Sequence, residues 1–81
     1  MPKLKNLSGE ELIKIFLTFN FIMAAQKGSH IKLARIKKDG TKQTLTIPNH
    51  SEMDKGTLKA IYRQALRYIS ENELKYHFYN E

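Results

Sequence analysis

The hydrophobic pattern of this 81-residue chain changes period twice, from helical to alternating and back to helical. Residues 12–19 place apolar side chains at intervals of three and four, which is typical of one buried helix face. Residues 30–47 alternate instead, as strands do when they bury one face of a sheet. From residue 54 the helical spacing returns. At this length one domain is expected, so we predict a single α+β domain spanning residues 1–81.

Capping residues predict where the helices begin. Ser8 and Glu11 form a capping box, in which each side chain accepts a hydrogen bond from the other residue's backbone N–H. Asn20 is expected to end this first helix. Asp54 can cap a second helix, and another capping box, Ser70–Glu73, predicts a short C-terminal helix.

Two tight turns divide the middle of the chain into three strands. Residues 21–26 form a short apolar run, which we expect to be a strand buried on at least one face. Gly28 and the pair Asp39-Gly40 supply the backbone conformations that tight turns need. The predicted order is α-β-β-β-α-α, with a three-stranded antiparallel sheet covered by helices on one face.

The alternation in the second and third strands predicts which side chains stay exposed. The aliphatic residues expected to meet the helices are Ile31, Leu33, Leu45 and Ile47. The residues that alternate with them along the strands then point to solvent, and these are His30, Lys32, Thr44 and Thr46. Core packing does not explain a histidine beside a lysine on such a face. A slip of one residue in register would turn His30 inward.

Charge points to a polyanionic partner. Fourteen Lys and Arg residues oppose eight Asp and Glu, which gives a net charge of +6. The cations gather between residues 27 and 42, where Asp39 is the single acid. This basic segment contains Lys27, Lys32, Arg35, Lys37, Lys38 and Lys42. We expect it to make salt-dependent contacts with phosphates, and a basic protein without such a partner is the alternative.

Several classes of protein are excluded or disfavoured. The absence of cysteine excludes a disulfide scaffold and a thiol nucleophile. The longest apolar run, residues 21–25, falls far short of the roughly 20 residues that cross a bilayer, and no signal peptide is visible. We therefore expect a cytoplasmic protein with no membrane partner. The set His50, Glu52 and Asp54 superficially suggests a metal site. Because these residues come from one segment, we expect no metal and no other cofactor.

His30 is the strongest candidate for chemistry. An imidazole with an ordinary pKa of about 6.5 can take and return a proton near neutrality. Neighbouring lysines favour its neutral form and can hold a phosphate nearby. A solvated surface histidine is the alternative. For His50 the functional readings are a phosphate donor, a proton shuttle or an RNA contact, and the plainer one is a hydrogen bond to the helix that follows.

Four segments of the chain resemble the HicA toxin family, small bacterial and archaeal mRNA interferases. They are Leu7-Ser8-Gly9-Glu10-Glu11-Leu12, Gln26-Lys27-Gly28-Ser29-His30, Thr46-Ile47-Pro48-Asn49-His50-Ser51, and Lys55-Gly56-Thr57-Leu58 with Ile61-Tyr62-Arg63-Gln64-Ala65. The resemblance covers residues 7–69, and its most specific part is the Gly-Ser-His triplet in its proper order before the other segments. It implies a double-stranded-RNA-binding-domain-like fold, ribonuclease activity carried by His30, and a HicB-type antitoxin that covers this site.

Two features depart from the family pattern. Ile31 stands where many members have a second histidine, which leaves catalysis on His30 alone. The segment after Ile69 is longer and more aromatic than usual, which suggests an altered partner or a homodimer contact.

Together the residues and the resemblance predict a metal-independent endoribonuclease that cleaves mRNA, with His30 as the catalytic residue. RNA contacts are expected from the basic segment and from Gly28, Ser29 and His50. Two alternatives stay open. One is a non-catalytic RNA-binding module of the same fold, and the other is an interaction protein whose basic face docks an acidic partner.

Overall fold

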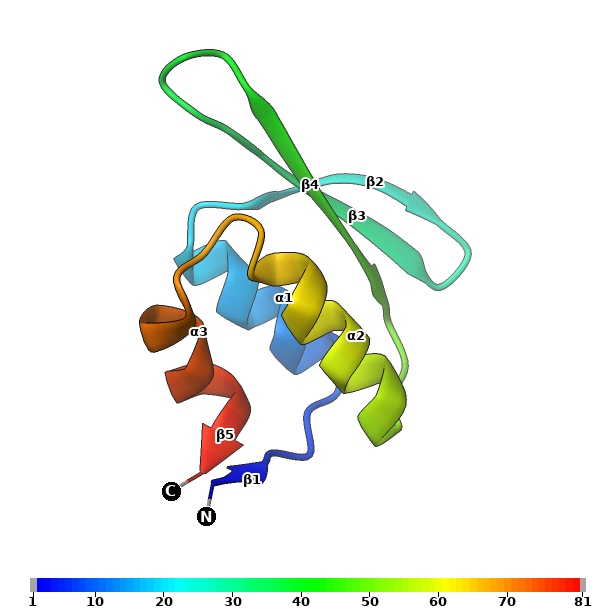
Figure 1. The fold of residues 1–81 in the computed structure, drawn as a ribbon. Coiled ribbons are helices and arrows are strands. Elements are labelled where there is room, and N and C mark those ends of the chain that lie inside the picture. The colour runs from blue at the N-terminus through cyan, green and yellow to red at the C-terminus, as the bar shows by residue number, and fades with distance from the viewer. Residues whose placement is uncertain (1, 81) are drawn as a thin grey trace.

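The computed structural model describes residues 2–80. Figure 1 shows the order of its elements, which confirms the predicted α-β-β-β-α-α sequence and adds a short strand near each end of the chain. The elements are β1 (Lys3–Leu4), α1 (Gly9–Thr18), β2 (Ile22–Lys27), β3 (His30–Ile36), β4 (Lys42–Pro48), α2 (Lys55–Ala65), α3 (Glu71–Phe78) and β5 (Tyr79–Asn80). β1 and β5 pair antiparallel and bring the two ends together.

Both ends of α1 form as the sequence predicts. The Ser8 hydroxyl accepts from the Glu11 N–H at 3.1 Å, and the Ser8 N–H donates to the Glu11 carboxylate at 2.9 Å. The bond from the Ser8 backbone N–H to the carboxylate is the main cause that holds the pKa of Glu11 below its ordinary value. Asn20 ends the helix with a φ of 72°, and the Phe21 N–H reaches back to the carbonyl of Phe16 at 3.2 Å.

The two later helices begin where expected, but only one has the predicted cap. The Asp54 carboxylate accepts from the Thr57 N–H at 2.6 Å, which lowers the pKa of Asp54. The second capping box does not form. Ser70 makes no side-chain bond to the helix backbone, and its hydroxyl donates to the Glu73 carboxylate at 3.0 Å. Acidic residues in the first turn of α3 still complement the positive end of the helix.

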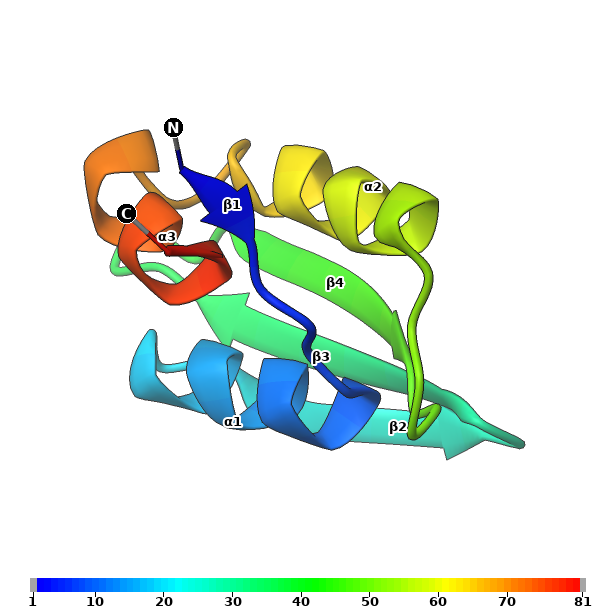
Figure 2. The same ribbon diagram turned by 90° about the horizontal axis from the view of Figure 1, so that it is seen from below.

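The three central strands form an antiparallel sheet in the order β2-β3-β4, with all three helices on one side (Figures 1 and 2). Ile31 pairs with Ile47 and Leu33 with Leu45, and none of these four side chains is more than 1% exposed. The predicted register is therefore confirmed. We call the other side of the sheet the open face. Its residues are Ile22, Ala25 and Lys27 of β2, His30, Lys32, Ala34 and Ile36 of β3, and Lys42, Thr44, Thr46 and Pro48 of β4.

The expectation that the first strand is buried on one face is wrong. All six residues of β2 are exposed, with Met23 at 53% even though it lies on the helix side. The physical reason is that β2 is an edge strand with a register shift between Met23 and Ala25, and that α1 and α2 pack against β4 instead. Phe21, which precedes the strand, reaches the core with 1% exposure.

The segment after Ile69 completes the core of its own chain. Phe78 is fully buried, and its ring centroid lies 6.1 Å from that of Phe16 in α1 and 5.1 Å from that of Tyr62 in α2. Figure 2 shows α3 closing one end of the helix layer between these two helices. The aromatic residue that this segment leaves in solvent is Tyr76, which is 78% exposed.

Arg35 joins the sheet to the ends of two helices. Its guanidinium donates to the Gln43 side chain at 2.8 Å, the Phe19 carbonyl at 2.9 Å and the Tyr68 carbonyl at 3.0 Å, and it stacks 4.7 Å from the Phe21 ring centroid. Carbonyl groups at helix C-termini attract cations. The structure thus gives Arg35 a structural role on the helix side of β3, whereas the RNA contact expected from the sequence stays a prediction.

Replacing Arg35 with alanine should lower the free energy of unfolding by about 2–4 kcal/mol, because three acceptors lose a charged donor. Urea denaturation measures this change. Lys37→Ala, which removes an exposed cation of the same segment, is the matched control and should stay within about 0.5 kcal/mol of the wild type. Equal stability of Arg35→Ala and the wild type would contradict the structural role.

Candidate nucleic-acid interface

A tight turn places His30 at one end of the open face. Gly28 has a φ of 60° and is the first of two residues between β2 and β3, a conformation that glycine adopts with little cost. Lys27 is the direct partner of His30 across this hairpin. Side chains so paired share a face with their Cβ atoms about 5 Å apart. The turn therefore sets an ammonium group beside an exposed imidazole.

Lys32 and Thr46 extend this end of the open face. Lys32 follows His30 on the same side of β3, and Thr46 lies opposite it on β4. All three side chains are exposed. The open face as defined above contains no Asp or Glu among the described residues. An approaching phosphate meets cations and a hydroxyl here, without a competing carboxylate on this face.

A second imidazole reaches the same end from the loop after β4. The Nε2 atom of His50 lies 3.3 Å from the Ser29 hydroxyl oxygen. The Asn49 N–H donates to the Ser29 carbonyl at 2.6 Å. Ser29 therefore ties the loop that carries His50 to the turn that carries His30. Two imidazoles on joined loops can divide acid and base roles between them.

The first residue of α1 holds the His50 loop from the other side. The Gly9 N–H donates to the His50 carbonyl at 2.8 Å. A Cβ atom on Gly9 would lie 2.5 Å from the Pro48 carbonyl oxygen and 2.6 Å from the Asn49 Cα, too close for any side chain unless the loop moves. Gly9 is therefore a positioning residue for His50. Sequence reasoning missed this role because the signal is an absent side chain inside a capping box.

The structure divides the basic segment between two ends of the sheet. The lysines at the His30 end are Lys27 and Lys32, and those at the β3–β4 hairpin are Lys37, Lys38 and Lys42. β3 runs from His30 to Ile36 between the two groups, a length of about 20 Å. Figure 1 shows the hairpin extending beyond the helices. The hairpin lysines can thus meet a nucleic acid only at a distance from His30.

The residues considered for a metal do not gather. Asp54 instead caps α2 through the Thr57 N–H. Across residues 2–80, no three His, Cys, Asp or Glu side chains lie close enough together to hold a metal ion. Within the same part of the chain, no helix has the length and apolar character needed to span a membrane.

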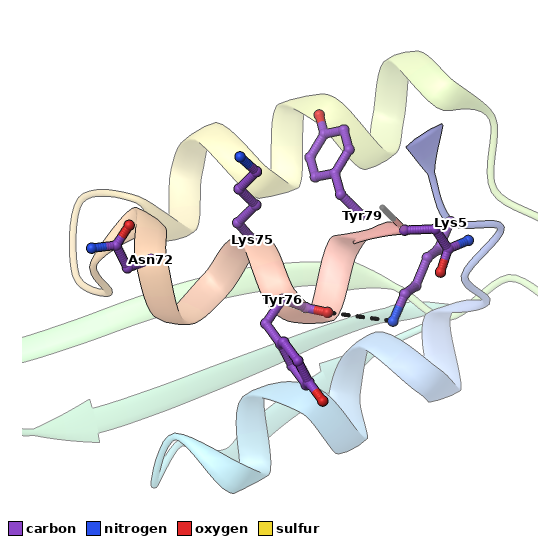
Figure 3. A pocket seen from close by; sticks show the side chains of 6 residues that line it. Lys5, Asn72, Lys75, Tyr76 and Tyr79 are labelled. Carbon is purple, nitrogen blue, oxygen red and sulfur yellow. Dashed lines mark hydrogen bonds between the residues drawn. The ribbon is translucent and has the colours of Figure 1, made fainter. Parts of the chain in front are cut away.

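A depression of about 540 Å³ lies beside α3 and β5, outside the region of His30. Figure 3 shows Lys75 and Tyr79 on one side of α3 and Tyr76 on the other. The Lys5 ammonium donates to the Tyr76 carbonyl at 3.4 Å. Because these polar groups do not converge on one point, we assign no site to this depression.

Comparison with known proteins identifies one family. A family model described as "HicA toxin of bacterial toxin-antitoxin" matches residues 9–66. This stretch contains α1, the three-stranded sheet and α2, and it includes His30, His50 and Gly9. The elements α3, β1 and β5 lie outside it. No curated protein and no solved structure matches the chain.

Gly9→Ala should displace the His50 loop, because the new methyl group overlaps backbone atoms. We expect a loss of about 1–3 kcal/mol in the free energy of unfolding and a shift of the His50 ring resonances in NMR spectra. Gly56→Ala is the matched control, since its Cβ would meet only the Asp54 carboxylate, at an ordinary 3.6 Å. Unchanged His50 resonances in Gly9→Ala would contradict the positioning role.

Proposed function

The chain belongs to the HicA toxin family, the toxin component of bacterial toxin–antitoxin systems, and from that premise we propose that it is a metal-independent endoribonuclease that cleaves mRNA. One observation carries the proposal. His30 is exposed on a helix-free face, beside Lys27 and two residues before Lys32. A ring enclosed by aliphatic side chains could not meet a polynucleotide, and His30 is not so enclosed.

In the proposed mechanism His30 is the general base. Its free ring nitrogen takes the proton of a ribose 2′-OH, and the 2′ oxygen forms a bond to the adjacent phosphorus while the bond from phosphorus to the 5′ oxygen breaks. The leaving 5′ oxygen needs a proton. His50, held against Ser29, is the proposed donor. The products are a 2′,3′-cyclic phosphate and a 5′-OH.

Lysines stabilise charge and hold the substrate in this scheme. Lys27 and Lys32 lie where they can offset the negative charge that develops on the phosphorane. The hairpin lysines contribute sequence-independent affinity that falls as salt rises. We further propose that a HicB-type antitoxin inhibits the toxin by covering the open face.

His30→Ala should reduce RNA cleavage at least about 100-fold, because the general base is lost. Its affinity for an uncleavable 2′-O-methyl RNA should change little, since the lysines remain. Single-turnover cleavage and fluorescence anisotropy measure the two effects. His77→Ala, which alters a histidine of α3, is the control and should cleave at the wild-type rate.

Two results would count against this assignment. Undiminished cleavage by His30→Ala would remove His30 from the chemistry. RNA binding without any cleavage by the wild-type protein would favour the non-catalytic RNA-binding module.

Cleavage should persist in EDTA, because the proposed catalytic groups are side chains. It should stop at any position where the ribose lacks its 2′-OH, because that hydroxyl is the proposed nucleophile. Mass spectrometry of the fragments should find the cyclic phosphate. Cleavage that EDTA abolishes, or that proceeds equally well on DNA, would refute the mechanism.

A further inference from the structure

The half of the open face that lies farthest from His30 carries exposed aliphatic side chains beside Lys42 and Thr44. Ile22 is 65% exposed and Ile36 is 70% exposed, and Ala34 lies on β3 opposite Ile22. They line a depression of about 370 Å³, which we call the apolar depression, and the other residues in its wall are Asn20, Ala24, Arg35 and Lys42. Two large aliphatic side chains kept in water at one place indicate a surface that another molecule covers.

Taking the proposed function as given, we propose that the apolar depression anchors the antitoxin. An aliphatic or aromatic side chain of the antitoxin would seat between Ile22 and Ile36. Carboxylates around that side chain would face Lys42 and the other lysines of the open face. The antitoxin is thus expected to combine an apolar anchor with an acidic rim.

The chemistry of the depression favours a protein over RNA. Phosphate and ribose gain little from aliphatic side chains, and the Arg35 guanidinium in the wall already donates to three acceptors of its own chain. Bases bind single-strand surfaces by stacking on aromatic rings, which the residues lining the depression lack. A buried apolar anchor inside a polar rim is the usual arrangement of a protein interface.

Charge favours an acidic partner over a second copy of this chain. The open face carries Lys27, Lys32 and Lys42 and, by the definition given above, no carboxylate. Each copy has a net charge of +6, so two open faces brought together repel each other. An acidic antitoxin is attracted to the same surface.

The distance between the depression and His30 accounts for inhibition. β3 spans about 20 Å from Ile36 to His30. An interface of ordinary size buries about 800 Å² on each partner, which is a patch about 30 Å across. An antitoxin anchored at Ile36 whose interface extends mainly along β3 toward His30 would block RNA by occupying its path. Anchoring and catalysis then depend on different residues of one face.

The test compares antitoxin binding by variants of the depression. Ile22→Ser and Ile36→Ser should each bind the separately purified cognate antitoxin at least about tenfold more weakly in isothermal titration calorimetry. Ile36→Glu should bind the antitoxin at least about 100-fold more weakly, because its carboxylate would be repelled by the carboxylates of the antitoxin. Leu17→Ser, which alters a 44% exposed leucine on α1, is the matched control with wild-type affinity.

The free variants should also keep their folded circular dichroism spectra and their rate of RNA cleavage, because both isoleucines lie outside the proposed catalytic groups. Wild-type affinity of Ile36→Ser and Ile36→Glu for the antitoxin would overturn the proposal. Lost RNA affinity with intact antitoxin binding would assign the depression to RNA instead, and a wild-type dimer in sedimentation that Ile36→Ser abolishes would assign it to a second copy. A wild-type toxin without ribonuclease activity would refute the proposed function and leave this binding comparison valid.

Discussion

The burial of one face of the sheet is the constraint on which the rest of the structure depends. Ile31, Leu33, Leu45 and Ile47 are almost completely buried beneath the helices, and each such side chain contributes about 1.5–3 kcal/mol. Because side chains alternate along a strand, this burial forces His30 to the opposite side. A slip by one residue would expose all four aliphatic groups, a cost far larger than any surface contact of an imidazole could offset.

The exposed side of the sheet is divided into two chemically different halves. The half with His30 carries lysines and is joined through Ser29 to His50. The other half carries exposed isoleucines around a shallow depression. On the helix side, Phe78 of α3 fills the gap between α1 and α2. The open face is therefore the side of the sheet that no helix covers, and we propose that RNA and the antitoxin both bind there, so that one excludes the other.

Local patterns predicted the fold, whereas contacts between distant segments escaped prediction. The changes of hydrophobic period, the Ser8–Glu11 cap and the Gly28 turn depend on neighbouring residues, and all three appear as expected. The exposure of β2 depends on where the helices pack, which no local pattern records. Arg35 is different, because it alternates along β3 in step with the buried residues and so points to the same side of the sheet. This alternation was enough to predict that its side chain points toward the helices.

The residues of the candidate site could be predicted more fully than the way they are arranged in space. The position of His30 follows from the strand alternation. The contact between Ser29 and His50 and the close approach of Gly9 join segments far apart in the chain. The central claim is that the open face meets RNA at His30, and NMR mapping tests it most directly. Addition of an uncleavable 2′-O-methyl RNA to ¹⁵N-labelled protein should shift the resonances of His30, Lys32 and Thr46. Shifts confined to α1 and α2, with these three unchanged, would contradict the account.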